Sequence, residues 1–125
     1  MPSLVIFDCD GVLVDSELIS CGVHAEALTR AGYPITSGQV AVRFLGRSSR
    51  EARREIEAEL GRALPEDFEV QLLDDLLHRF AAALQPIPFV ADALDRIAVP
   101  VCVASSGTLD RIAAALSCTG LYARF

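Results

Sequence analysis

The sequence contains no lysine and no tryptophan, and all eleven of its basic residues are arginines. Its 17 acidic residues give a formal net charge of −6, so it lacks the basic surface that nucleic-acid-binding proteins use. The absence of lysine also excludes enzymes that form an imine with a lysine amine. We therefore expect no nucleic acid among its partners.

Cysteine pairs, histidine clusters and long apolar segments are missing as well. The four cysteines form no CxxC pair, and the two histidines, His24 and His78, have no metal-ligand spacing, so we interpret both as structural. This pattern favours a reduced, cytoplasmic protein. The N-terminus has no basic n-region and its apolar stretch ends at Asp8, which predicts neither a signal peptide nor a contact with the membrane.

The residues that are present direct attention to one turn near the N-terminus. Leu4 to Phe7 is a continuous apolar run, typical of a strand buried in a parallel sheet, and it stops at Asp8 and Asp10, which Gly11 follows. Residues i and i+2 at a strand end point the same way, so both carboxylates would enter one crevice beyond the sheet. Such an anionic crevice implies a divalent cation, Mg²⁺, as cofactor.

The same segment has a second interpretation, because Asp-Gly between two apolar runs is also a strong hairpin signal. The run Val12 to Val14 would then form the second strand. Against this, Asp15-Ser16-Glu17 shortens that strand and is typical of a helix start. Cys9, between the two carboxylates, is expected to be a small buried packing residue, since nothing basic lies near it in the sequence to favour a thiolate.

Helical patterns fill the segment that follows this turn. We expect one helix before Gly32, two short helices that begin at Thr36 and Ser48, and a long amphipathic helix that ends before Pro86. Beyond Pro86, the pattern predicts a helix over 91–97, a second strand over 101–104, and a last helix that Ser105-Ser106-Gly107-Thr108 opens and Gly120 closes.

This order of elements predicts an α/β fold, a parallel-sheet core of the Rossmann type into which an α-helical cap is inserted. The expected core comprises residues 1–14 and 86–125, and the expected cap comprises residues 15–85. Two strands are few for an independently stable parallel sheet, so we expect the core to be incomplete and the chain to be the N-terminal part of a longer protein.

The segment from Val5 to Glu17 resembles the first signature of the haloacid dehalogenase superfamily of phosphotransferases. The cap between the first two strands matches the branch that contains phosphoglycolate phosphatases, β-phosphoglucomutases and sugar-phosphate phosphatases. The resemblance implies that Asp8 is the nucleophile, that Asp10 is the general acid and base, and that both are ligands of Mg²⁺. The substrate would be a small phosphate ester.

The second signature of this family is a serine or threonine at the end of the second strand, which Ser105 supplies. Ser105, Ser106 and Gly107 would then bind the phosphoryl group at the start of the last helix, although the run Ser-Ser-Gly-Thr that ends at Thr108 is also a common N-cap. In the expected cap, Gly46-Arg47-Ser48 resembles the family's substrate-specificity loop. Arg47 would bind an anionic group of the substrate, and a solvated surface arginine is the alternative.

The family pattern is not complete in this chain. A lysine or, in some members, an arginine after a later core strand and the acidic pair that follows it are not found, and Phe89 stands where the family usually has glycine. Asp10 disfavours a dehalogenase, and Ser20 in place of the mutase's histidine disfavours a β-phosphoglucomutase. The signature segments look most like those of bacterial sugar-phosphate phosphatases, including enzymes that act on 6-phosphogluconate.

We therefore expect a Mg²⁺-dependent phosphomonoester hydrolase that works through an aspartyl-phosphate. A mutase-like phosphotransferase is one alternative. The other is a truncated, non-catalytic homologue that associates with itself or with a protein partner through an uncovered sheet edge.

Overall fold

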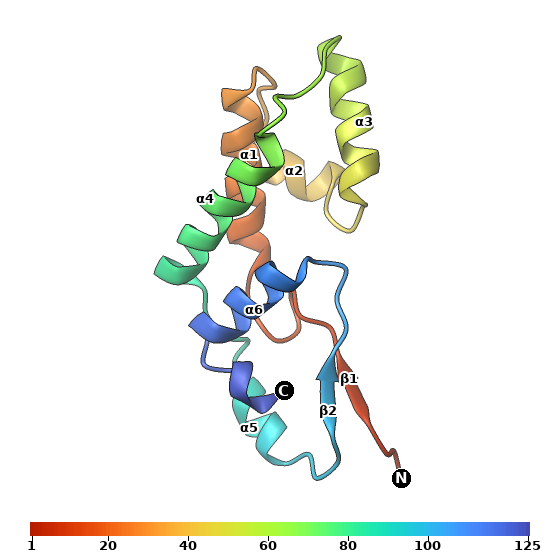
Figure 1. The fold of residues 1–125 in the computed structure, drawn as a ribbon, viewed down its shortest axis with the longest axis vertical. Helices are drawn as coiled ribbons and strands as arrows, with labels where there is room; N and C mark the ends of the chain where they lie inside the picture. Colours follow the sequence, from red (N-terminus) through yellow and green to blue (C-terminus); the bar gives the residue numbers. More distant parts are fainter. The chain divides into compact units, whose positions relative to one another are not determined.

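The computed structural model describes all residues from 1 to 125 and contains two strands, six α-helices and a short 3-10 helix (Figure 1). In chain order these are β1 (Val5–Phe7), α1 (Glu17–Arg30), α2 (Ser37–Arg43), α3 (Ser49–Leu60), α4 (Phe68–Ala83), α5 (Val90–Asp95), β2 (Val101–Val103), α6 (Leu109–Cys118) and η1 (Tyr122–Arg124). The elements expected from the sequence are confirmed in type and order, but the expected burial of the first strand is wrong, since Val5 and Phe7 are only half-buried and Ile6 is exposed.

The two strands form a parallel sheet, although five helices lie between them in the sequence. Phe7 is in register with Val103, and the amide of Ala104 donates to the carbonyl of Phe7 at 2.9 Å. The two strands therefore end at the same level. As a result, the loops that follow Phe7 and Val103 begin side by side at the carboxyl edge of the sheet.

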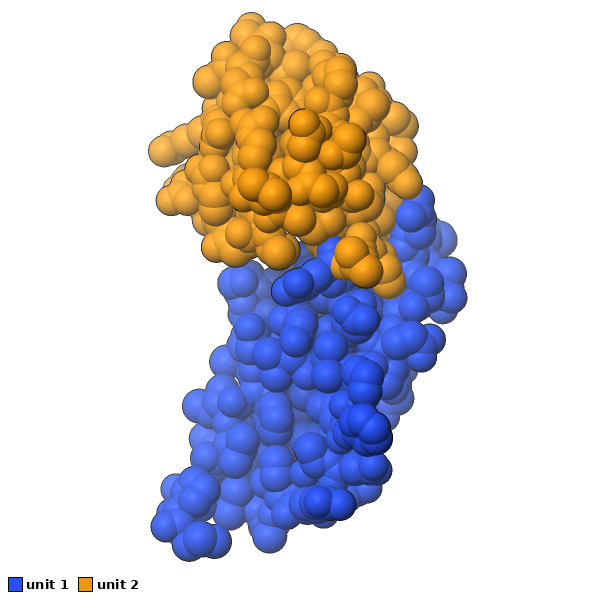
Figure 2. Space-filling model, turned by 180° about the vertical axis from the view of Figure 1, so that it is seen from behind, with its two compact units in different colours: residues 1–17, 77–125 blue, residues 18–76 orange.

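The chain divides into two compact units, which Figure 2 shows in different colours. Unit 1 comprises Met1–Glu17 and Leu77–Phe125 and contains the sheet, whereas unit 2 comprises Leu18–Leu76. The second boundary falls within α4. The domain limits expected from the sequence, with a cap of residues 15–85, stay a prediction.

Unit 2 is a helical unit with a core of its own, and local signals fix its helix ends. Thr36 and Gln39 form a capping box at the start of α2, and the Ser48 side chain accepts from the Glu51 amide at the start of α3. Gly61 ends α3 in the left-handed conformation, at φ 70°. The buried side chains that the helices share are Cys21, Ala25, Leu28, Tyr33, Ile35, Val40, Ile56 and Leu64.

Unit 1 is built on the turn after β1, which directs Leu13 and Val14 into its interior, where both are fully buried. The amide of Ile87 donates to the carbonyl of Leu13 at 2.9 Å, so the connector after α4 is held against this turn. Phe80, from the last turns of α4, is the largest fully buried side chain of the protein. Burial of these apolar side chains holds the turn in place.

Phe89 is the only residue other than glycine with a positive φ, at 66°. It precedes α5 as its N-cap, and its side chain makes no capping hydrogen bond and is largely exposed. A left-handed conformation is unfavourable for an aromatic residue, so this position stores backbone strain.

None of the helices combines the length and the apolar character that crossing a membrane requires.

Candidate active site

The turn after β1 presents the two carboxylates predicted from the sequence. Asp8 is exposed at the end of the strand, and its Oδ1 accepts a hydrogen bond from the amide of Cys9 at 2.8 Å. The carbonyl of Cys9 accepts from the amides of Leu13 and Val14, which closes the turn. Gly11 adopts φ 75°, a left-handed conformation that favours glycine.

The hairpin alternative for this segment is wrong. Val12 and Leu13 belong to the turn, Val14 makes only isolated bridges to Asp10 and Pro86, and α1 begins at Glu17. The reason lies in the burial of Leu13 and Val14, since an extended second strand would carry one of two consecutive apolar side chains to the other face of the sheet.

The loop after β2 holds the second group of predicted residues. Ser105 is half-buried, and its Oγ accepts from the amide of Gly107 at 3.2 Å. Thr108, the last residue of the Ser-Ser-Gly-Thr run, is the N-cap of α6, because its side chain accepts from the amide of Arg111 at 3.3 Å. This loop and the Asp8 turn leave neighbouring strands at one edge, so the structure brings these two predicted groups together.

Asp10 has two hydrogen-bond partners, and neither is among the site residues predicted from the sequence. Its Oδ1 accepts from Oγ of the fully buried Ser16 at 2.6 Å and from Nη2 of Arg111 at 3.2 Å. Arg111 lies three residues after the N-cap of α6, one turn into the helix. An arginine in the first turn of a helix, where acidic residues are favoured, is the sequence signal that would have pointed to it.

The oxygen donors at this edge are of the kind that Mg²⁺ prefers. However, no three His, Cys, Asp or Glu side chains lie together in a geometry that could hold a metal ion. Oδ1 of Asp10 is already engaged by Ser16 and Arg111. The Asp8 carboxylate and the Asp10 backbone carbonyl, which the family resemblance implies as ligands, would form only part of a site.

Cys9 is buried beneath the two carboxylates, as expected. Burial raises the pKa of its thiol to about 11, the negative charges of Asp10 and Asp8 contribute to this, and the Arg111 guanidinium opposes it. Nothing basic lies near Cys9 in the sequence, but Arg111 is close enough in space for its charge to act on the thiol. Burial nevertheless outweighs its effect.

The cap loop predicted to bind substrate lies in unit 2. Gly46 adopts φ 80° and Ser48 is the N-cap of α3, so local geometry accounts for both residues. Arg47 is not simply solvated, because its Nη1 pairs with Oε2 of Glu55 at 2.6 Å. The same carboxylate binds Arg43, and these charge-assisted hydrogen bonds hold the pKa of Glu55 below its usual range.

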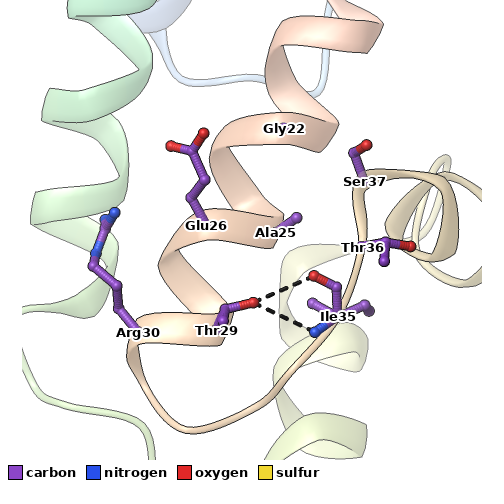
Figure 3. Close-up of a pocket in the computed structure, with 8 residues that line it drawn as sticks. All are labelled: Gly22, Ala25, Glu26, Thr29, Arg30, Ile35, Thr36 and Ser37. Atoms are coloured by element: carbon purple, nitrogen blue, oxygen red, sulfur yellow. Dashed lines mark hydrogen bonds between the residues drawn. The ribbon is translucent and has the colours of Figure 1, made fainter.

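Unit 2 also contains a shallow hollow of ≈ 460 Å³ between α1 and the segment that leads into α2 (Figure 3). Thr29 bridges its two sides, with its Oγ1 bonded to the backbone oxygen and nitrogen of Ile35 at 3.3 and 3.4 Å. Arg30, at its rim, pairs with Asp75. None of the site residues predicted from the sequence lines this hollow.

The parallel sheet carries an Asp-x-Asp-Gly turn after its first strand and a serine loop after its second, with a helical segment between the two strands. This arrangement defines an α/β protein whose candidate site lies at the carboxyl edge of the sheet. A family-wide sequence profile described as haloacid dehalogenase-like hydrolase matches residues 2–125. The chain belongs to this family. Its fold is the family's α/β core, which has two strands here, with an inserted helical cap.

Individual relatives agree with this assignment. The chain is 31% identical over 104 residues to the 6-phosphogluconate phosphatase of Escherichia coli, a match that covers 82% of this chain and 47% of the relative. The crystal structure of a haloacid dehalogenase-like protein of unknown function from Agrobacterium tumefaciens matches the chain with a TM-score of 0.79 and a sequence identity of 35%. The match covers 98% of this chain and 55% of that one.

A second crystal structure, of a hydrolase of the same family from Deinococcus radiodurans with bound phosphate and sodium, is 26% identical with a TM-score of 0.67. The match covers 98% of this chain and 54% of that protein. The chain thus spans about half the length of the relatives it matches.

Proposed function

We propose that the protein is a Mg²⁺-dependent phosphomonoester hydrolase of a small anionic metabolite, such as a sugar phosphate or a phosphoglycolate-like ester. The observation that carries the proposal is the meeting of the Asp8-x-Asp10 turn and the Ser105 loop at one edge of the sheet. The similarity to a 6-phosphogluconate phosphatase and to a phosphate-bound hydrolase supports the substrate class.

In the first step, a carboxylate oxygen of Asp8 attacks the phosphorus atom of the ester. A bond from Asp8 to phosphorus forms, the bond from phosphorus to the ester oxygen breaks, and the leaving alkoxide takes a proton from Asp10. The exposed position of Asp8 at the strand end supports its role as the attacking group.

In the second step, a water molecule attacks the phosphorus atom of the aspartyl-phosphate. Asp10 accepts a proton from this water, the bond between phosphorus and Asp8 breaks, and inorganic phosphate leaves. Ser105 and the amide of Gly107 are suited to bind the phosphoryl oxygens, because they lie in the loop that leads into α6. A bound Mg²⁺, held in part by Asp8 and Asp10, would neutralise charge on those oxygens.

We assign substrate selection to the loop of Gly46, Arg47 and Ser48. Arg47 would exchange its ion pair with Glu55 for an anionic group of the substrate, such as a sugar acid carboxylate. Both side chains of this pair are partly exposed, so the exchange involves little change in burial.

Hydrolysis of p-nitrophenyl phosphate by the full-length gene product tests the proposal. Asp8→Asn removes the nucleophile, so kcat/KM should fall by at least about 10³-fold. Activity should disappear with EDTA and return with added Mg²⁺. Asp95→Asn, at an exposed carboxylate of the same unit that pairs with Arg124, is the matched control and should retain activity. Activity that survives Asp8→Asn, or that needs no divalent cation, would contradict the proposal.

A further inference from the structure

One oxygen of the Asp10 carboxylate is held from two sides. Oγ of Ser16 donates to Oδ1 at 2.6 Å, and Nη2 of Arg111 donates to the same atom at 3.2 Å. Ser16 lies six residues further along the chain, whereas Arg111 comes from α6. Two donors on one oxygen fix the plane of the carboxyl group and leave Oδ2 as the atom that neither of them engages.

Arg111 is itself held more firmly than a surface arginine. Its side chain is 22% exposed, compared with 59% for Arg30 in its ion pair with Asp75. Its guanidinium carbon lies 5.8 Å from the ring centre of the fully buried Phe80, within the range of a cation–π contact. Its Nε atom is buried without a hydrogen-bond partner. A buried donor without a partner is rare, and a functional role is one of the few reasons for it.

The start of α6 determines where this guanidinium lies. The backbone amide of Arg111 donates to Oγ1 of the N-cap Thr108 at 3.3 Å, and the side chain of Arg111 donates to Asp10. The loop after β2 and the turn after β1 are therefore connected through one side chain. A shift of the loop after β2 would therefore move Arg111, and with it the carboxylate of Asp10.

We propose that Arg111 is a positioning residue that, together with Ser16, holds Oδ1 of Asp10 so that Oδ2 faces the ester oxygen of the substrate. The inference rests on the proposed function, because it assigns Arg111 a role in proton transfer by Asp10. It predicts a specific defect, in which the enzyme still forms the aspartyl-phosphate from an ester with a good leaving group but forms it slowly from an ester whose leaving group needs a proton.

The leaving-group dependence of kcat/KM in the full-length protein tests this role. An alkoxide needs a proton from Asp10 to leave, whereas p-nitrophenolate leaves without one. We would compare p-nitrophenyl phosphate with an alkyl phosphate, either 6-phosphogluconate or glycerol 3-phosphate, whichever the wild type hydrolyses faster. Arg111→Gln should lower kcat/KM for the alkyl phosphate about 10- to 100-fold and for p-nitrophenyl phosphate less than about 3-fold.

Two further variants separate positioning from folding. Arg124→Gln removes an arginine of the same unit from its ion pair with Asp95 and should change neither value. Arg111→Lys keeps the charge but loses the planar donor fork, so it should show a smaller loss with the same preference for the good leaving group. This variant also preserves the test if Arg111→Gln does not fold.

The possible outcomes distinguish the inference from the proposed function. Equal losses on both esters, no loss on either, or faster hydrolysis of the alkyl phosphate by Arg111→Gln would overturn the role of Arg111 while phosphatase activity stands. A wild type that hydrolyses only p-nitrophenyl phosphate would overturn it as well. A wild type that hydrolyses none of these esters contradicts the proposed function, and the inference fails with it.

Discussion

At the scale of single residues, the surroundings of Cys9 show how burial can outweigh a nearby positive charge. The thiol lies between two aspartates in sequence and close to Arg111 in space, yet its pKa rises to about 11 because burial disfavours the thiolate. A cysteine beside the proposed nucleophile is thus prevented from competing with it. The side chain fills space beneath the turn and takes no part in the proposed reaction.

We predict that Cys9 is protected from alkylation in the folded protein. A pKa near 11 lowers the thiolate fraction at pH 8 about 100-fold relative to a pKa of 9, and the side chain is also inaccessible. Burial also raises the pKa of the Cys118 thiol, but Cys118 is exposed, so iodoacetamide labelling followed by peptide mass spectrometry should find Cys118 modified before Cys9. In urea, Cys9 should react readily. Labelling of Cys9 in the folded protein as fast as that of Cys118 would show the prediction to be wrong.

At the scale of elements, the start of α5 departs from the rest of the fold. The other positive φ angles occur at glycines, whereas Phe89 adopts φ 66° with an exposed ring that contributes little burial. The family resemblance suggests glycine at this position. The strain is local, since the helix that follows still buries Val90 and Leu94 in unit 1.

Phe89→Gly should therefore stabilise the protein. Relief of the left-handed conformation contributes about 1–2 kcal/mol, and the greater freedom of glycine in the unfolded chain offsets about 0.5–1 kcal/mol of this. The net gain should be roughly 0.5–1 kcal/mol in the free energy of unfolding, measured by urea denaturation. Phe89→Ala removes the ring but keeps the strained conformation, so it should bring no comparable gain. Equal effects of the two substitutions would contradict this account.

At the scale of the whole molecule, charge is distributed differently between the two units. In unit 2, Arg43 contacts the carboxylates of Glu55 and Glu59 and the hydroxyl of Tyr33, which in turn donates to Glu59. These hydrogen bonds hold the pKa values of both glutamates below their usual range. In unit 1, the ion pair of Arg111 and Asp10 is more buried than that of Arg124 and Asp95, and it lies at the proposed site.

The glutamates of unit 2 make stability depend on pH in the acid range. A depressed pKa means that the folded state favours the ionised form, so this stabilisation is present above the ordinary glutamate pKa of 4.5 and is lost as the pH falls through the folded value. The melting temperature, followed by circular dichroism, should drop below about pH 4.5 in the wild type. The drop should be shallower in a Glu55→Gln, Glu59→Gln double variant.

The exposed Glu66 provides the matched control for this experiment. Glu66→Gln should leave the pH dependence of the melting temperature close to that of the wild type. Parallel acid curves for the double variant and the wild type would show that the cluster of Arg43, Glu55 and Glu59 does not contribute as described.

The sequence by itself determined the elements and most of the local geometry. Capping at Thr36 and Ser48, the apolar runs of both strands and the left-handed glycines depend on interactions within a few residues, and such interactions can be read from spacing alone. For the same reason, the sequence alone predicts the Asp8-x-Asp10 turn and shows its resemblance to the family.

Only the tertiary structure decided which distant groups meet. The parallel pairing of β1 with β2 and the contact between Arg111 and Asp10, 101 residues apart, follow from how helices pack on strands, and no local pattern encodes this. Likewise, the choice between a hairpin and a turn after Gly11 depended on where Leu13 and Val14 are buried. Spacing in the sequence predicted the carboxylates of Asp8 and Asp10, whereas tertiary packing brings the guanidinium of Arg111 to Asp10.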